Sequence, residues 1–96
     1  MSKLILGTVQ MGLDYGVNNI SGKITSENSC LILSKAFESE IDTLDTAEAY
    51  GNAHQVIGNF HELNPKMKFK VITKIPNDVK AAEIEKKVKT YIRELN

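Results

Sequence analysis

Three short strand-like segments alternate with three segments of helical periodicity, and this order is the strongest constraint on the fold. The strand-like segments run from Lys3 to Val9, from about Glu40 to Leu44 and around Lys68 to Thr73. Each is followed by apolar residues spaced three and four apart, which is the period of a helix with one buried face. Such alternation is typical of βαβ units, whose strands are parallel. The sequence therefore predicts an α/β fold with the order βαβαβα.

Each helical segment has an apolar stripe and recognisable ends. We expect the first helix to begin at about Ser26, whose hydroxyl can cap the free N–H groups, and the second to run from near Asn52 to Asn64, before a proline. The third spans roughly Asp78 to Leu95. The predicted stripes are Cys30, Ile32, Leu33, Ala36 and Phe37; Ala53, Val56, Ile57 and Phe60; and Ile84, Val88, Tyr91, Ile92 and Leu95.

Three local patterns complete the predicted layout. A loop containing Gly12, Gly16 and Gly22 follows the first strand, and glycine permits the tight turns that such a loop needs. Lysines alternate with Met67 and Phe69 at the entry to the third strand, which indicates a strand with one solvated face. On the last helix we expect the i,i+4 ion pairs Glu83 with Lys87 and Glu85 with Lys89.

Length and charge limit the classes of protein to consider. The chain has 96 residues, twelve Lys plus Arg and twelve Asp plus Glu, which predicts a single unit over residues 1–96. Balanced charge without long runs of one sign argues against nucleic-acid or membrane partners. The only cysteine is Cys30, which excludes an internal disulfide and favours the cytoplasm. The amino terminus has an apolar run too short for a secretory signal.

Other sites of chemistry are disfavoured by spacing. His54 and His61 are seven positions apart, unlike the close spacing of a helical zinc pair, so we expect no metal site. Cys30 lies on a predicted buried stripe and has no basic neighbour to activate it. The glycines Gly7 and Gly12 have the spacing of a phosphate loop but lack its following lysine and hydroxyl residue.

The carboxyl ends of the three strands bring together the most reactive side chains. In parallel α/β folds this edge carries the functional loops. It would gather Gly7 and Thr8 after the first strand, Asp45 after the second and Lys74 after the third, with Tyr50 in the loop beyond Asp45. A tyrosine has a pKa of about 10, and a nearby lysine ammonium would lower it. The set predicts a tyrosine general acid, which suits carbonyl reduction.

The same residues resemble a known family, the aldo-keto reductases, which are (β/α)8 barrels that use NADPH or NADH. The resemblance lies in Leu6 to Gly16, in Asp45-Thr46-Ala47-Glu48-Ala49-Tyr50-Gly51 followed by Ile57-Gly58, and in Val71-Ile72-Thr73-Lys74. It implies that Tyr50 is the general acid, Lys74 its neighbour and Asp45 the partner of the lysine. It also implies that Gly7, Thr8 and Asp45 place the nicotinamide end of the cofactor. The chain would form the first three βα units of such a barrel.

Two departures accompany the resemblance. His54 stands where the family usually has an acidic residue, and the family's catalytic histidine lies on the next strand, beyond Asn96. The implied activity is reduction of a small aldehyde or ketone, and we expect these 96 residues to be inactive alone. Two alternatives stay open. In the first, the chain is a non-catalytic assembly module that self-associates or pairs with the rest of a barrel through unpaired strand edges. In the second, it is a small ligand-binding domain unrelated to the barrel.

Overall fold

A three-stranded parallel sheet organises the molecule. The computed structural model describes residues 4–14 and 22–96, and its strands are β1 (Leu6–Gly7), β2 (Thr43–Asp45) and β3 (Lys70–Ile72). They lie in the order β1-β2-β3, and both pairs are parallel. The predicted α/β class with parallel strands is confirmed. Leu44 in the central strand pairs with Leu6 on one side and with Val71 on the other.

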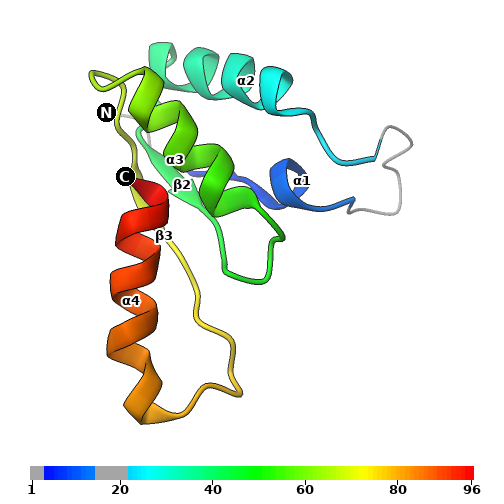
Figure 1. Cartoon of the computed structure of the whole chain (residues 1–96). Helices are drawn as coiled ribbons and strands as arrows, with labels where there is room; N and C mark the ends of the chain where they lie inside the picture. The colour runs from blue at the N-terminus through cyan, green and yellow to red at the C-terminus, as the bar shows by residue number, and fades with distance from the viewer. Residues whose placement is uncertain (1–3, 15–21) are drawn as a thin grey trace.

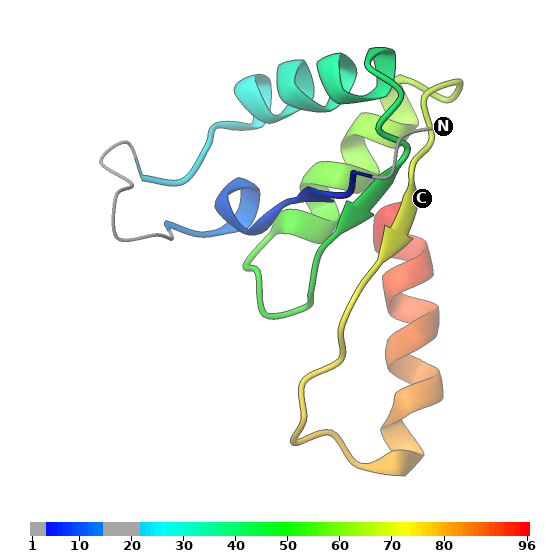
Figure 2. The same ribbon diagram turned by 180° about the vertical axis from the view of Figure 1, so that it is seen from behind.

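Helices α1 to α3 lie in the connections between the strands, and α4 follows the last strand. The described residues contain α1 (Val9–Gly12), α2 (Ser26–Glu38), α3 (Ala53–Leu63) and α4 (Ala81–Leu95). Figures 1 and 2 show α3 and α4 on the same face of the sheet, with α2 running across the end of α3. No helix in the described ranges is both long enough and apolar enough to cross a membrane.

The core lies between the sheet and the helices α2 and α3. Leu33, Leu44, Ile57 and Phe60 are completely buried there. Phe69, at the entry to β3, packs edge-on against Phe37 with ring centroids 5.3 Å apart, a favourable arrangement of two aromatic quadrupoles. All four residues of the predicted α3 stripe are buried, which confirms that stripe: Ala53, Val56, Ile57 and Phe60.

The first loop and the first long helix differ from the prediction. Val9 begins the short helix α1 instead of ending a strand, and Gly12 is the last residue of that helix. The N-cap of α2 is Thr25, not Ser26, because the Thr25 hydroxyl accepts the Asn28 N–H at 3.1 Å. Residues 1–3 and 15–21, including Gly16, lie outside the described part of the chain.

The second strand starts later than predicted because Glu40 ends the preceding helix. Glu40 has a φ of 70°, the left-handed conformation that closes a helix. The Glu40 N–H donates to the Phe37 carbonyl and the Ile41 N–H donates to the Ala36 carbonyl, each at 3.0 Å. These two bonds form a Schellman motif, which usually has glycine at the position of Glu40. The buried face of α2 also differs from the predicted stripe, because Ser29 is buried and Ile32 is exposed.

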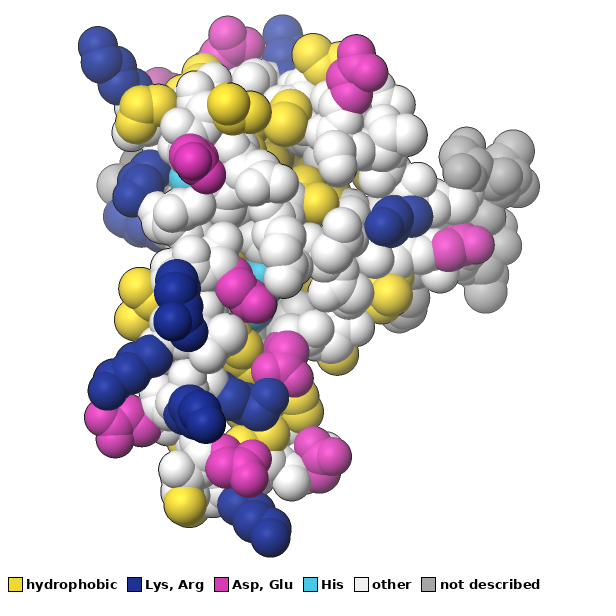
Figure 3. Space-filling model, in the orientation of Figure 1, with side chains coloured by type: hydrophobic (Ala, Val, Ile, Leu, Met, Phe, Trp, Pro, Cys, Tyr) yellow, Lys and Arg dark blue, Asp and Glu magenta, His cyan; other side chains and the backbone are white. Residues whose placement is uncertain are grey.

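Helix α4 buries much less of its apolar face than the sequence predicts. Tyr91 is buried, but Ile84, Val88 and Ile92 are 42%, 40% and 67% exposed. In Figures 1 and 2 the N-terminal half of α4 extends beyond the sheet, and Figure 3 shows charged and hydrophobic side chains mixed over this part of the surface. The helix begins at Ala81 rather than Asp78. The predicted Glu85–Lys89 pair is present at 3.3 Å, whereas Lys87 pairs with Glu48 at 2.6 Å.

Candidate active site

Strand register brings the predicted site residues to one edge of the sheet. Gly7 pairs with Asp45, and Asp45 pairs with Ile72, so the three strands end level with each other. Side chains alternate along a strand, and Leu44 points into the core, so Asp45 points to the face away from the helices. Figure 2 shows the loops after β2 and β3 leaving the sheet at this same edge. We call this edge, with Gly7, Asp45, Tyr50 and Lys74, the rim.

Asp45 and Lys74 form an ion pair at the rim. The Lys74 ammonium donates a hydrogen bond to the Asp45 carboxylate, and the two side chains are 49% and 42% exposed. This bond, more than any other interaction, raises the pKa of Lys74 above its ordinary value, and partial burial opposes it. An exposed pair of this kind contributes little to stability, about 0–1 kcal/mol. Its main consequence is that Lys74 stays charged and in place.

Tyr50 lies beside this pair. The Lys74 ammonium nitrogen is 5.3 Å from the centroid of the Tyr50 ring, a distance at which the cation interacts with the ring face. The Tyr50 N–H donates to the Ala47 carbonyl and the Tyr50 carbonyl accepts from the Ala53 N–H, each at 3.1 Å. The structure therefore brings Asp45, Tyr50 and Lys74 together, as the sequence predicts, although their catalytic roles stay predictions.

Two glycines allow the Tyr50 loop to lie close to α1. A Cβ atom added to Gly12 would meet the Tyr50 carbonyl oxygen at 1.6 Å, and one added to Gly51 would meet the Gly12 carbonyl oxygen at 2.2 Å. Gly51 also has a φ of 58°. Gly12 is therefore needed for close backbone approach, rather than for the loop turn that the sequence predicts.

Gly7 and Thr8 occupy different environments at the rim. A Cβ added to Gly7 would meet no atom within 4 Å, so the backbone there faces open space. Thr8 is buried, and its hydroxyl and its N–H both donate to the Asp45 carbonyl, at 3.0 and 3.1 Å. Thr8 thus secures the backbone that carries Asp45, and its contact with a cofactor stays a prediction.

Glu48 is a residue of the site region that sequence reasoning missed. One of its carboxylate oxygens accepts hydrogen bonds from the Lys87 ammonium at 2.6 Å and from the Tyr91 hydroxyl at 2.7 Å. The Lys87 bond is the first cause that lowers the pKa of Glu48, followed by the Tyr91 bond. Burial, then the Glu48 carboxylate, raises the pKa of Tyr91 to about 12. The position of Glu48 between Asp45 and Tyr50 was the only signal of its role in the sequence, and its hydrogen-bond partners could not be predicted because they are about 40 positions away.

The two histidines are buried and hydrogen-bonded. The His54 ring lies 3.1 Å from a Glu94 carboxylate oxygen through Nδ1 and 2.7 Å from the Thr73 hydroxyl through Nε2. The His61 ring accepts the Phe69 N–H at 3.1 Å, and its Nδ1 lies 2.7 Å from the Leu95 carbonyl. No three His, Cys, Asp or Glu side chains gather as a metal site in residues 4–14 and 22–96.

The rim offers a proton donor, a cation and an open backbone edge. Tyr50 has a hydroxyl proton, and the Asp45 carboxylate accepts a hydrogen bond from the Lys74 ammonium. The open space over Gly7 lies beside Asp45, because these two residues are paired in the sheet.

The chain is similar to one known family of proteins. The family model described as the aldo/keto reductase family matches residues 3–96. A crystal structure of PA4992 from Pseudomonas aeruginosa, assigned to the aldo-keto reductases, superposes with a TM-score of 0.80 at 27% identity, covering 98% of this chain and 38% of that one. A second structure of the same description and organism has a TM-score of 0.76 at 24% identity, with 98% and 37% covered. No curated protein matches the chain at a significant level.

Proposed function

Because the chain belongs to the aldo-keto reductase family, we propose that its rim serves the reduction of an aldehyde or ketone to an alcohol. The three βα units are the first three of the (β/α)8 barrel of this family of oxidoreductases. The observation that carries the proposal is the Lys74 ammonium, held by Asp45 and lying 5.3 Å from the Tyr50 ring centroid. Asp45 at the end of β2, Tyr50 in the loop after β2 and Lys74 after β3 meet at the edge where such barrels have their active sites.

The proposed roles follow from the charges at the rim. Tyr50 donates its hydroxyl proton to the carbonyl oxygen of the substrate as that oxygen gains negative charge. The Lys74 ammonium stabilises the phenolate left behind, and Asp45 keeps the ammonium charged and oriented. A proton donor placed in this way contributes about 100-fold to 10,000-fold to a rate.

The cofactor is part of the proposal. Gly7 and Asp45 would line the nicotinamide end of NADPH or NADH, with Thr8 supporting the Asp45 backbone. When bound, the nicotinamide supplies the hydride. The presence of a single cysteine supports a reducing, cytoplasmic setting.

The chain spans about 38% of the length of the solved structure with the higher TM-score, so the activity belongs to an assembled barrel. We expect the 96 residues alone to turn over no carbonyl substrate, because three strands cannot enclose a barrel interior.

A hybrid barrel tests this proposal. Residues 1–96 would replace the matching segment of PA4992, and NADPH and NADH oxidation would be followed with a panel of small aldehydes and ketones. We expect the hybrid to be active and Tyr50→Phe or Lys74→Met to lower kcat at least about 100-fold. Lys89→Met, on the exposed surface of α4, is the matched control and should retain activity. Full activity of the Tyr50→Phe hybrid would exclude the proposed role of Tyr50.

A second candidate function is assembly, and exposed apolar residues favour it. Ile5, just before β1, and Ile72 in β3 are 52% and 50% exposed, and the α4 face of Ile84, Val88 and Ile92 is also open to solvent. Burying these side chains against another copy or against the remainder of a barrel would be favourable. Sedimentation equilibrium decides this candidate, because a monodisperse monomer at high concentration would argue against self-association.

A further inference from the structure

Tyr50 and Lys74 come from different loops, so their distance depends on contacts that hold the two loops together. Glu48, two positions before Tyr50, makes one of these contacts through its backbone. Its N–H donates to the Lys74 carbonyl at 3.2 Å, which ties the Tyr50 loop to the backbone of the lysine. Glu48 thus connects the loop that carries Tyr50 to the segment that carries Lys74.

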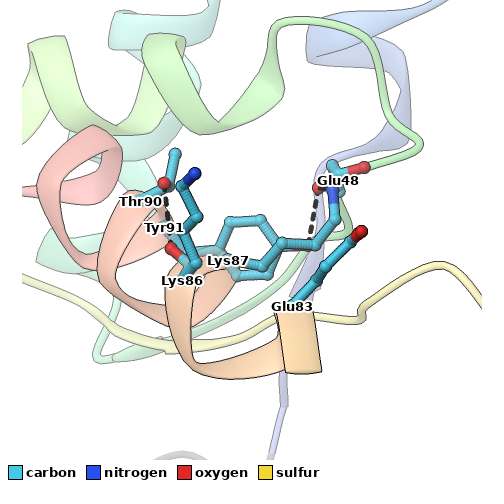
Figure 4. Close-up of a pocket in the computed structure, with 6 residues that line it drawn as sticks. All are labelled: Glu48, Glu83, Lys86, Lys87, Thr90 and Tyr91. Carbon is cyan, nitrogen blue, oxygen red and sulfur yellow. Dashed lines mark hydrogen bonds and ion pairs between the residues drawn. The ribbon is translucent and has the colours of Figure 1, made fainter. Parts of the chain in front are cut away.

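Helix α4 holds the side chain of Glu48. The Lys87 ammonium and the Tyr91 hydroxyl donate to the same Glu48 oxygen at 2.6 and 2.7 Å, and Figure 4 shows Lys87 and Tyr91 reaching from α4 to Glu48. Glu48 and Lys87 are about one-third exposed, and Tyr91 is buried. The two donors restrain the carboxylate from one side, so the backbone of Glu48 is held as well.

A second link runs from α4 to the residue before Lys74. The Glu94 carboxylate can only accept, so His54 Nδ1 donates to it at 3.1 Å, and His54 Nε2 lies 2.7 Å from the Thr73 hydroxyl. The Gln55 amide donates to the other Glu94 oxygen at 3.2 Å. Thr73 follows the last residue of β3 and directly precedes Lys74, so this chain of bonds restrains the segment that leads from β3 to Lys74.

Tyr91 connects the two links. Its ring packs edge-on against the His54 ring, with centroids 5.0 Å apart, while its hydroxyl bonds Glu48. We call Glu48, His54, Tyr91 and Glu94 the α4 bracket. The bracket lies on the helix side of the sheet, whereas Asp45 points to the opposite face, so its members act on the rim through the backbone.

We propose that the α4 bracket is a positioning device for the Tyr50–Lys74 pair, with Glu48 as its central positioning residue. The inference rests on the proposed function, because it assigns these residues to the geometry of the proton donor. A misplacement of about 1 Å at such a pair costs on the order of 100-fold in rate. Loss of Glu48 should therefore act on kcat while the cofactor-facing residues remain intact.

The test measures the geometry directly in the 96-residue chain. Nuclear Overhauser contacts between the Lys74 side chain and the Tyr50 ring would be compared in wild type, Glu48→Ala and Glu48→Gln. We expect Glu48→Ala to weaken these contacts severalfold, and Glu48→Gln, which keeps an acceptor oxygen, to restore part of them. Glu85→Ala is the matched control, because it also removes a carboxylate that pairs with a lysine of α4.

A second variant keeps the test decisive if Glu48→Ala does not fold. Tyr91→Phe keeps the ring contact with His54 and removes only the hydroxyl bond to Glu48, and it should also weaken the Tyr50–Lys74 contacts. Unchanged contacts in Glu48→Ala or Tyr91→Phe, or an equal loss in Glu85→Ala, would overturn the inference.

The same variants in the hybrid barrel separate this inference from the proposed function. We expect Glu48→Ala to lower kcat about 10-fold to 100-fold with little change in KM. If the contacts change but the wild-type hybrid reduces no carbonyl, the bracket holds the geometry and the reductase proposal fails.

Discussion

Replacing His61 tests how two buried backbone groups are satisfied in this fold. The His61 ring accepts the Phe69 N–H at the entry of β3, and because a carbonyl can only accept, its Nδ1–H donates to the Leu95 carbonyl at the end of α4. His61→Leu removes both bonds. An unpaired buried group costs about 1–3 kcal/mol, and the Leu95 carbonyl is less buried than the Phe69 N–H, so we expect a loss of about 2–4 kcal/mol at pH 8.

The same ring makes stability depend on pH. Burial is the main cause that lowers the pKa of His61 from its ordinary value of 6.5, and the Leu95 carbonyl opposes it. Below pH 6.5 the unfolded chain therefore binds more protons than the folded chain at this site. The contribution of His61 is complete above pH 6.5 and falls as the pH is lowered, by up to about 1.4 kcal/mol per pH unit, until the folded state is also protonated.

Urea unfolding at pH 8, 6.5 and 5.5 measures both effects, since the midpoint and slope yield the free energy of unfolding. Wild type should lose more stability than His61→Leu between pH 6.5 and 5.5. His61→Gln is the matched control, because its amide offers a donor and an acceptor but does not titrate. A stability difference between wild type and His61→Leu that is absent at pH 8, or that stays constant across this range, would refute the reasoning.

Three further predictions concern single positions. Gly12→Ala should lower the free energy of unfolding by about 1–3 kcal/mol or more in urea titrations, because the new Cβ meets backbone of Tyr50 that cannot move aside; unchanged stability would contradict the close approach. Glu40→Gly should raise it by up to about 1 kcal/mol by relieving the positive φ, and a loss would argue against that conformation. Asp45→Asn should lower the pKa of Lys74 toward its ordinary value in an NMR titration, whereas an unmoved midpoint would show that the carboxylate is not its main partner.

The rim could be predicted from the sequence because it depends on apolar periodicity, on local motifs and on the rule that parallel strands end at a common edge. Apolar periodicity located the ends of the strands to within a few residues, and parallel strands present those ends at a common edge. Asp45, Tyr50 and Lys74 follow from this rule together with the family-like motifs around them. Glu40 shows the limit of local signals, because a glutamate side chain does not indicate that its backbone adopts the left-handed conformation that ends a helix.

Helix α4 shows a second limit. Its apolar stripe is present in the sequence, but burial requires a facing surface, and the described residues cover only Tyr91 and part of Leu95. Lys87 likewise had an acidic neighbour on its own helix, Glu83, yet it pairs with Glu48. An i,i+4 ion pair contributes only a few tenths of a kcal/mol, so it is replaced when folding brings a better-placed carboxylate within reach of the lysine.

By itself, the sequence determined the order of the three strands and the three long helices, the parallel sheet and the edge at which the reactive side chains gather, because these follow from residue spacing along the chain; it did not predict the short helix α1. Only the tertiary structure decided the partners of the buried polar groups. His54 bonds a residue 40 positions away, and His61 accepts an N–H from a residue 8 positions away and contacts a carbonyl 34 positions away. Hydrogen bonds depend on distance and direction in space, and periodicity along a chain contains neither.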